Sequence, residues 1–184
     1  MPQRLEDLDF RFENSRVRVI ANRNYPEMKL AGISVGPFQE GNEYELYYWI
    51  ARELTDAGVT HFREEDSLDA TKLYKIQWKE RVQVAGQISE LPEDFYPKMR
   101  RYLEQIRQEA AKQPERIQEY RKAKDLADDI VTSRLKKIVT LSSGPTQGEQ
   151  VLAKLTAEER LIYMKLGKAV SQWQTEILHH EGEE

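Results

Sequence analysis

The chain has 184 residues, of which 39% are hydrophobic and 33% charged, with a formal net charge of −4 and a pI near 5.6. This length predicts one domain or a small domain attached to a medium one, and the mild acidity argues against a protein that binds nucleic acid mainly by neutralising phosphates. Cysteine is absent, which excludes disulfides and thiolate metal sites. We also expect no signal peptide and no membrane partner, because no window approaches the roughly 20 apolar residues of a membrane span.

The first part of the chain, residues 1–62, predicts a small β-rich domain. Residues 16–20 alternate polar and apolar side chains, the period of a half-buried strand. Residues 28–35 predict a second strand that ends at a glycine-proline turn, because proline cannot donate to a strand ladder. A short strand is possible at 43–46, and apolar residues at three- and four-residue steps predict a helix over 46–57.

A charged connector at 63–66 leads to a helical domain over 67–184. Ser67 is the expected N-cap of its first helix, which should end at Gly86. Acidic residues and a proline predict the start of a second helix within 89–97, and that helix fades by Lys112. Together the two parts predict an α+β protein: a small N-terminal β-rich domain with a short helix, followed by a mainly helical bundle.

The longest predicted helix starts at Pro114 and ends at Leu141. Residues 142–149 are rich in serine and glycine and predict a mobile loop. Thr156 and Glu159 have the spacing of a capping box, which predicts the start of the last helix. The acidic tail after that helix should fray.

No set of residues predicts catalysis. The glycine-rich segments 36–41 and 144–148 lack the lysine and hydroxyl pair of a phosphate-binding loop and predict turns. His61 is isolated, and the adjacent His179 and His180 cannot form a closed metal site. The acidic run at 64–66 is best interpreted as a solvated linker. The sequence therefore predicts a protein that is not an enzyme and needs no cofactor or metal.

One segment carries a local excess of positive charge. Residues 98–137 contain twelve Lys or Arg and seven Asp or Glu, within a chain whose net charge is negative. The excess could be a face that meets DNA or an acidic partner, or an ordinary solvated helix surface with ion pairs one turn apart. The candidate residues of such a basic face are Arg100, Arg101, Arg107, Arg121, Lys122, Lys136 and Lys137.

Aromatic residues are spread over several predicted helices, and most should lie in the core. The last helix is the exception, because its apolar stripe is wider than one neighbouring helix needs. Trp and Tyr are enriched at protein contacts, so this stripe can be core or partner interface. The aromatic residues considered are Trp78, Tyr102, Tyr120, Tyr163 and Trp173.

With these residues described, the chain resembles a subunit of GINS, the replication-fork scaffold. It resembles in particular the archaeal "two-three" type, in which the small β-rich domain comes first and the helical domain second. The resemblance covers nearly the whole chain. The helical half matches mainly in the order of its segments, and the more specific match is a structural motif in the small domain. The motif residues are Gly36, Pro37, Phe38, Gly41 and Trp49.

The resemblance implies a non-catalytic, cytoplasmic and chromosome-associated archaeal protein. It implies assembly with a second GINS subunit type as a two-plus-two hetero-tetramer, and contacts with the MCM helicase, a Cdc45/RecJ-like protein, and DNA polymerase or primase. The alternative is a helical adaptor that binds DNA through the basic face of residues 98–137. Carried over to this chain, the subunit interface would lie on the long helix and the last helix, with candidate residues Tyr120, Ile130, Leu135, Ile138, Tyr163, Leu166, Val170, Trp173 and Ile177.

Overall fold

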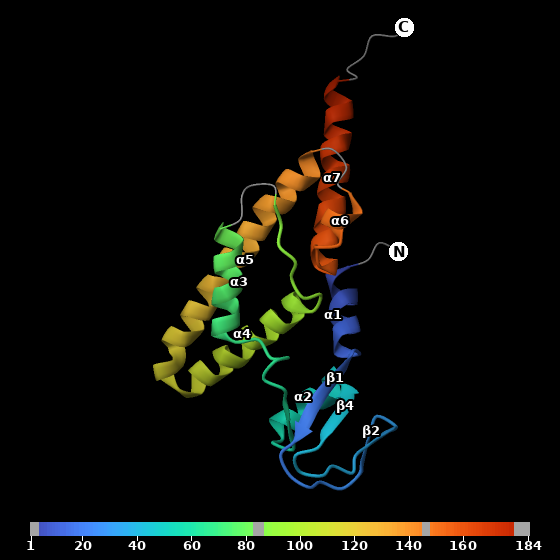
Figure 1. Cartoon of the computed structure of the whole chain (residues 1–184), viewed down its shortest axis with the longest axis vertical. Helices are drawn as coiled ribbons and strands as arrows, with labels where there is room; N and C mark the ends of the chain where they lie inside the picture. The colour runs from blue at the N-terminus through green and yellow to red at the C-terminus, as the bar shows by residue number, and fades with distance from the viewer. Residues whose placement is uncertain (1–3, 83–86, 145–147, 179–184) are drawn as a thin grey trace. The chain divides into compact units, whose positions relative to one another are not determined.

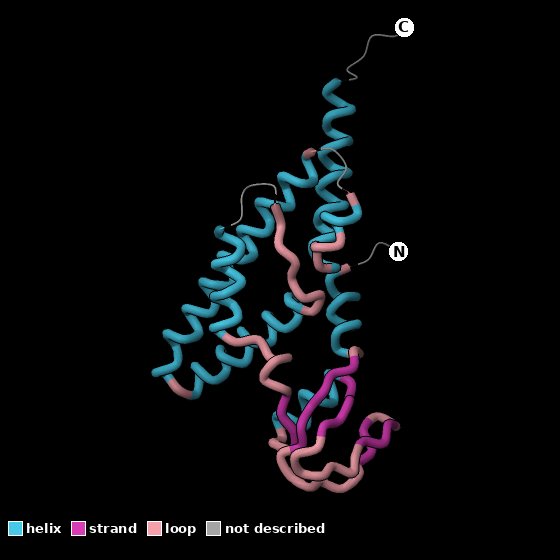
Figure 2. Tube along the Cα trace, viewed as in Figure 1, coloured by secondary structure: helices cyan, strands magenta, loops and turns pink. Residues whose placement is uncertain are grey.

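A computed structural model describes residues 4–82, 87–144 and 148–178 (Figure 1). The chain divides into two compact units, a small unit of Leu5–Ser67 and a helical unit that begins at Leu68. Figure 2 shows that every strand of the described residues belongs to the first unit and that the described part of the second is built of helices and loops. The α+β class predicted from the sequence is confirmed.

The small unit combines a three-stranded antiparallel sheet with two helices and a separate hairpin. The sheet has the order β4–β1–β5, and β2 pairs with β3 alone. Its elements in chain order are α1 (Leu5–Glu13), β1 (Arg16–Ala21), β2 (Met28–Leu30), β3 (Ile33–Val35), β4 (Glu43–Tyr47), α2 (Tyr48–Asp56) and β5 (Thr60–Phe62).

The core of the small unit lies between the sheet and α2. Phe38 is only 2% exposed, and its ring meets that of Tyr44 edge to face at 4.8 Å between centroids. Gly36 has a φ of +94°, and a Cβ there would lie 3.2 Å from the Phe38 ring, so a larger residue would be both strained and crowded. Gly41 also has positive φ, and Trp49 packs half-buried against this core.

Three features of the small unit differ from the prediction. Helix α1 and strand β5 were not predicted. The strand expected over 28–35 is instead the β2–β3 hairpin, because Ala31 and Gly32 have φ of +50° and +81° and reverse the chain. Positive φ at both central residues is the geometry that two-residue hairpin loops favour.

The helical unit is organised around its longest helix, α5. Helices α3, α4 and α7 all pack against α5. Its elements are α3 (Ala70–Val82), α4 (Phe95–Lys112), the 3-10 turn η1 (Pro114–Arg116), α5 (Ile117–Ser143), α6 (Glu149–Leu152) and α7 (Ala157–Leu178). None of the described helices is long and apolar enough to cross a membrane.

Two apolar clusters form the core of this unit, and α5 contributes to both. The first joins α3, α4 and the N-terminal half of α5, with Leu73, Phe95 and Ile130 almost fully buried. The second joins the C-terminal end of α5 to the start of α7, with Ile138 and Leu155 at its centre.

Several predicted boundaries of the helical unit change. The N-cap of α3 is Asp69, whose Oδ1 accepts the Lys72 N–H at 2.7 Å, whereas Ser67 donates its hydroxyl to the Glu64 carbonyl at 2.9 Å. The loop expected over 142–149 is shorter, because α5 continues to Ser143 and α6 begins at Glu149. The helix end expected at Gly86 and the tail after Leu178 lie outside the described residues.

Candidate functional site

The first half of α7 packs against the end of α5. Ile162, Tyr163 and Leu166 lie at helical spacing and are half-buried against the second core cluster. A Cβ added to Gly167 would lie 3.9 Å from the carbonyl oxygen of Ser142, one residue before α5 ends. The two helices therefore remain in contact up to about Gly167.

The second half of α7 continues beyond that contact, as Figure 1 shows. Val170 is half-buried, and every residue from Ser171 to Leu178 is exposed. Trp173 is 61% exposed and Ile177 is 59% exposed. Both lie on the same helix face as Leu166, because they follow it at seven and eleven residues. We call Val170, Trp173 and Ile177 the distal α7 stripe.

Helix α5 carries a second exposed apolar stripe. Val131, Leu135 and Val139 follow one another at four-residue steps and are 40–45% exposed. We call these three residues the α5 stripe. Ile130 and Ile138, expected at the subunit interface, are instead 0% and 2% exposed in the chain's own core, so they offer nothing to a partner. Only Leu135 of the long-helix candidates belongs to an exposed stripe.

Tyr120 and Tyr163, also expected at the interface, are half-buried and pack on the first and second core clusters respectively. Tyr102 packs on the first cluster as well. Trp78 is 59% exposed and so does not lie in the core, unlike the three tyrosines. Trp173, for which core and partner interface were both left open, is 61% exposed.

A buried ionic cluster fixes the helices to which these stripes belong. Arg134 of α5 is fully buried and makes a bidentate pair with Glu159 of α7, with Nε–Oε1 at 2.7 Å and Nη2–Oε2 at 2.6 Å. Its Nη1 also donates to Glu80 of α3 at 3.0 Å and to the Ser89 carbonyl at 2.6 Å. Bidentate pairs of this kind fix geometry as well as charge.

Lys137 completes the cluster. Its Nζ donates to Glu80 Oε2 at 2.6 Å and to the Glu80 carbonyl at 2.9 Å. The Tyr96 hydroxyl of α4 donates to Glu159 Oε1 at 2.7 Å, and the Ser89 hydroxyl donates to Glu80. Two cations therefore meet two carboxylates, and the cluster joins α3, α4, α5 and α7. Glu159 also closes the predicted capping box, since its Oε2 accepts the Thr156 N–H at 3.1 Å; that prediction is confirmed.

The surroundings shift the pKa values of Glu80, Tyr96 and Arg134 in the cluster. Burial by itself would raise the pKa of Glu80, but the hydrogen bonds from Lys137 and Ser89 and the charge of Arg134 together lower it. Burial and the nearby Glu159 carboxylate raise the pKa of Tyr96, so this phenol remains a hydrogen-bond donor. The hydrogen bond to Glu159 and the charges of both carboxylates outweigh desolvation and raise the pKa of Arg134.

Some of the cations counted toward the proposed basic face are buried in this cluster. Lys137 is 7% exposed and binds Glu80, so its assignment to a surface face is wrong, and the nearby Arg134 is buried too. Arg101 is half-buried and donates to the Pro97 carbonyl, and Arg107 pairs with Glu104 on its own helix. The other candidate residues of the face, Arg100, Arg121, Lys122 and Lys136, are exposed.

Where the structure describes them, the other candidate motifs form no reactive site. His61 is exposed and its Nδ1 lies 2.5 Å from the Asn22 side-chain oxygen. Within the described ranges, no three His, Asp or Glu side chains are placed to hold a metal ion. A shallow depression in the small unit is lined by turn residues such as Tyr25, Phe38 and Glu40. His179 and His180 lie outside the described residues.

A comparison with protein families now identifies the helical unit. The model of the family described as "Sld5: GINS complex protein helical bundle domain" matches residues 57–178, which include α3 through α7. The chain belongs to the GINS family. It is thus a DNA-replication protein that assembles with other GINS subunits. No curated protein matches the chain significantly.

GINS membership gives the exposed stripes a context. A subunit of a multi-chain complex is expected to expose, when isolated, apolar surface that its partners cover. Trp173 and Ile177 of the distal α7 stripe and the three residues of the α5 stripe are apolar side chains that the isolated chain leaves exposed. The buried ionic cluster, by contrast, belongs to the GINS bundle itself, because all its members come from one chain.

Proposed function

We propose that this chain is a non-catalytic scaffold subunit of GINS, of the archaeal "two-three" type with the small domain first. The observation that carries the proposal is the distal α7 stripe, in which Trp173 and Ile177 continue an apolar face past the end of α5. We propose that this stripe, together with the α5 stripe, contacts the second GINS subunit type.

The distal half of α7 extends beyond the contacts that stabilise the first half. Eleven residues of helix, from Lys168 to Leu178, extend beyond the contact with α5 at Gly167, and isolated helices of that length are marginal in water. A tryptophan buries on the order of 150–250 Å² when it is covered. Docking a partner on Trp173 would therefore stabilise both the helix and the complex, which favours a role in assembly.

The wider role rests on the resemblance of the chain to archaeal GINS. We propose that two copies of this chain and two of the partner subunit form the complex, which bridges the MCM helicase and a Cdc45/RecJ-like protein and contacts polymerase or primase. We further propose that it is chromosome-associated in an archaeal cell. The buried ionic cluster supports a scaffold role, because it locks the helices of the bundle against one another and keeps the stripes in fixed positions.

The DNA-adaptor alternative has less support. Two of the twelve cations that suggested a basic face, Arg134 and Lys137, lie in the buried cluster. Arg107 and Arg116 are paired with carboxylates on the surface. The remaining positive charge is dispersed over α4 and α5 among seven acidic residues, as on an ordinary solvated surface.

Co-expression with the second GINS-type subunit of the same genome tests the proposal. We expect light scattering to give a single hetero-oligomer with the partner. Trp173→Ala/Ile177→Ala should dissociate it, and the control Gln172→Ala/Thr175→Ala, on the opposite face of the same half-helix, should not. A chain that ignores the partner subunit, or equal behaviour of the two double variants, would contradict the proposed interface.

A further inference from the structure

Helix α3 presents an apolar stripe of its own to solvent. Tyr74, Trp78 and Val82 follow one another at four-residue steps and are 58%, 59% and 61% exposed. The opposite side of the helix is buried against α4 and α5 through Leu73 and Gln77. Three large exposed apolar side chains in one row are unusual on a helix whose other face is already packed.

The exposed charges of helix α3 itself have one sign. The basic residues of α3 are Lys72, Lys75, Lys79 and Arg81, and its only acidic residue, Glu80, is buried in the ionic cluster. Lys75 and Lys79 each follow an exposed aromatic residue, and neither forms an ion pair with any residue in the described ranges.

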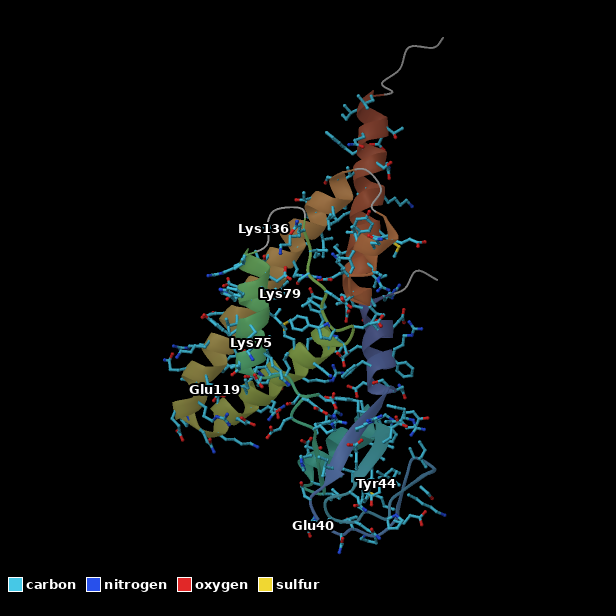
Figure 3. The ribbon with its side chains drawn as sticks, viewed as in Figure 1. Glu40, Tyr44, Lys75, Lys79, Glu119 and Lys136 are labelled. Carbon is cyan, nitrogen blue, oxygen red and sulfur yellow. The ribbon has the colours of Figure 1, made fainter. Side chains whose placement is uncertain are left out.

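Helix α5 adds a further cation to the same side. Lys136 is exposed and directly precedes Lys137, whose Nζ reaches Glu80 of α3. Figure 3 shows Lys75, Lys79 and Lys136 along one side of the helical unit. We call Tyr74, Trp78 and Val82, with these three lysines, the α3 face.

We propose that the α3 face is a docking site for an acidic, amphipathic helix of a partner protein. Such a helix carries apolar side chains at three- and four-residue steps, which would pack on Tyr74, Trp78 and Val82. Carboxylates flanking that row would meet Lys75, Lys79 and Lys136. The α3 face differs in charge from the distal α7 stripe, because the distal half of α7 carries only two charged residues, Lys168 and Glu176.

Two other occupants fit less well. Single-stranded nucleic acid would stack on the two aromatic rings, but Val82 has no ring to offer, and the Asp129 carboxylate at the edge of the face binds Arg81 at 2.7 Å. A second copy of the chain, docked symmetrically, would place the same lysines against each other, because a two-fold contact pairs identical surfaces. Like charges in contact are unfavourable, so the charge pattern favours an acidic partner.

A displayed library of 18-residue helical peptides, selected on the full-length chain, tests this inference. We expect the selected peptides to be acidic, with apolar residues at three- and four-residue steps. Their binding should shift the fluorescence of Trp78 to shorter wavelength and weaken as salt rises. Trp78→Ala should reduce the affinity at least about tenfold, as for a contact hot spot.

Charge reversal gives the matched comparison. Lys75→Glu/Lys79→Glu should also reduce the affinity for the selected peptides about tenfold or more. The control Lys124→Glu/Lys154→Glu makes the same change in net charge at exposed lysines elsewhere on the chain and should leave that affinity unchanged. All four residues are exposed, so both variants should fold, which circular dichroism would verify.

The inference is overturned by any of several results. The library could yield basic or uncharged peptides, or no peptide at all. The selected peptides could also bind equally well to the two charge-reversed variants. It is also overturned if an oligo-dT strand binds and Trp78→Ala abolishes that binding, or if the chain self-associates through Trp78. None of these results bears on the distal α7 stripe, so the proposed subunit interface would stand or fall separately.

Discussion

The two halves of α7 have similar sequence patterns and different surroundings. In the first half, Leu161 is buried, Ile162 and Leu166 are half-buried, and Glu159 is bound to Arg134. In the second half, Trp173 and Ile177 repeat the apolar spacing while more than half exposed. The first half is covered by the chain itself, whereas the side chains of Ser171–Leu178 are all exposed.

This difference separates what stabilises the fold from what we propose serves assembly. Substitutions in the first half remove contacts within the chain and should lower its free energy of unfolding. Substitutions of Trp173 and Ile177 in the second half remove side chains that are mostly exposed in the isolated chain, so their effect should appear only with a partner. Four changes test this distinction, in order of expected effect.

Arg134→Ala should have the largest effect. It leaves Glu80 and Glu159 buried without their main cation, and breaking a buried ion pair in this way costs roughly 3–5 kcal/mol. Thermal unfolding of the isolated chain would show a greatly lowered Tm or loss of the fold. The control, Lys136→Ala, removes an exposed cation two residues away and should change stability by less than about 0.5 kcal/mol. Equal Tm values for the two variants would refute the role given to the cluster.

Trp173→Ala/Ile177→Ala should act only on assembly. We expect the Tm of the isolated chain to stay near that of the wild type, because both side chains are mostly exposed. Loss of a contact hot spot worth about 2 kcal/mol would weaken binding of the second subunit roughly 30-fold. Isothermal calorimetry measures this directly. A lowered Tm with unchanged subunit affinity would place both residues in the chain's own core instead.

The stability of the isolated chain should also depend on the ionisation of Glu80. Its pKa is lower in the folded chain than the ordinary value of 4.5, so its contribution is fully present above pH 4.5 and is lost as the pH falls through the folded-state pKa. Urea unfolding between pH 7 and pH 3 should therefore show a steeper loss for the wild type than for Glu80→Gln. Parallel pH profiles would mean that Glu80 is not stabilised in its charged form.

Thr156→Ala should have the smallest effect. It removes the hydroxyl that lies 3.4 Å from the Glu159 N–H but keeps the backbone N–H that Glu159 accepts. Loss of an N-cap residue costs about 1 kcal/mol, and the long distance places this one at the low end of that range. Differential scanning calorimetry would detect the change, and Thr156→Ser should restore most of it. A loss as large as that of Arg134→Ala would mean that the cap and the cluster act as one unit.

Much of the fold could be predicted from the sequence, because local signals were strong. Alternation predicted β1, Gln113-Pro114 marked the break before α5, and the Thr156–Glu159 spacing predicted the start of α7. Helix α1 was missed although Leu5, Leu8 and Phe12 follow helical spacing, and Leu8 and Phe12 are buried. Strand β5 has only three residues and is recognisable mainly through its pairing with β1, which is a long-range contact.

The candidate site was predicted only in part. Arg134 and Lys137 were counted as surface cations because of their residue type, yet they share one helix face with the buried Ile130, Ile138 and Leu141. That spacing was the available signal for burial. Their carboxylate partners lie 25 to 57 residues away, on α7 and α3, so the pairing itself required the three-dimensional fold.

Hydrogen exchange of α7, in the isolated chain and in the complex with the second GINS subunit, tests the central claim most directly. Backbone amides of a packed helix exchange slowly and those of an unsupported helix end exchange quickly. We predict that amides of Ala157–Leu166 are protected in both states, and that amides of Gly167–Leu178 become protected only on assembly. Unchanged, rapid exchange of Gly167–Leu178 in the assembled complex would contradict the claim that this half of α7 is a subunit interface.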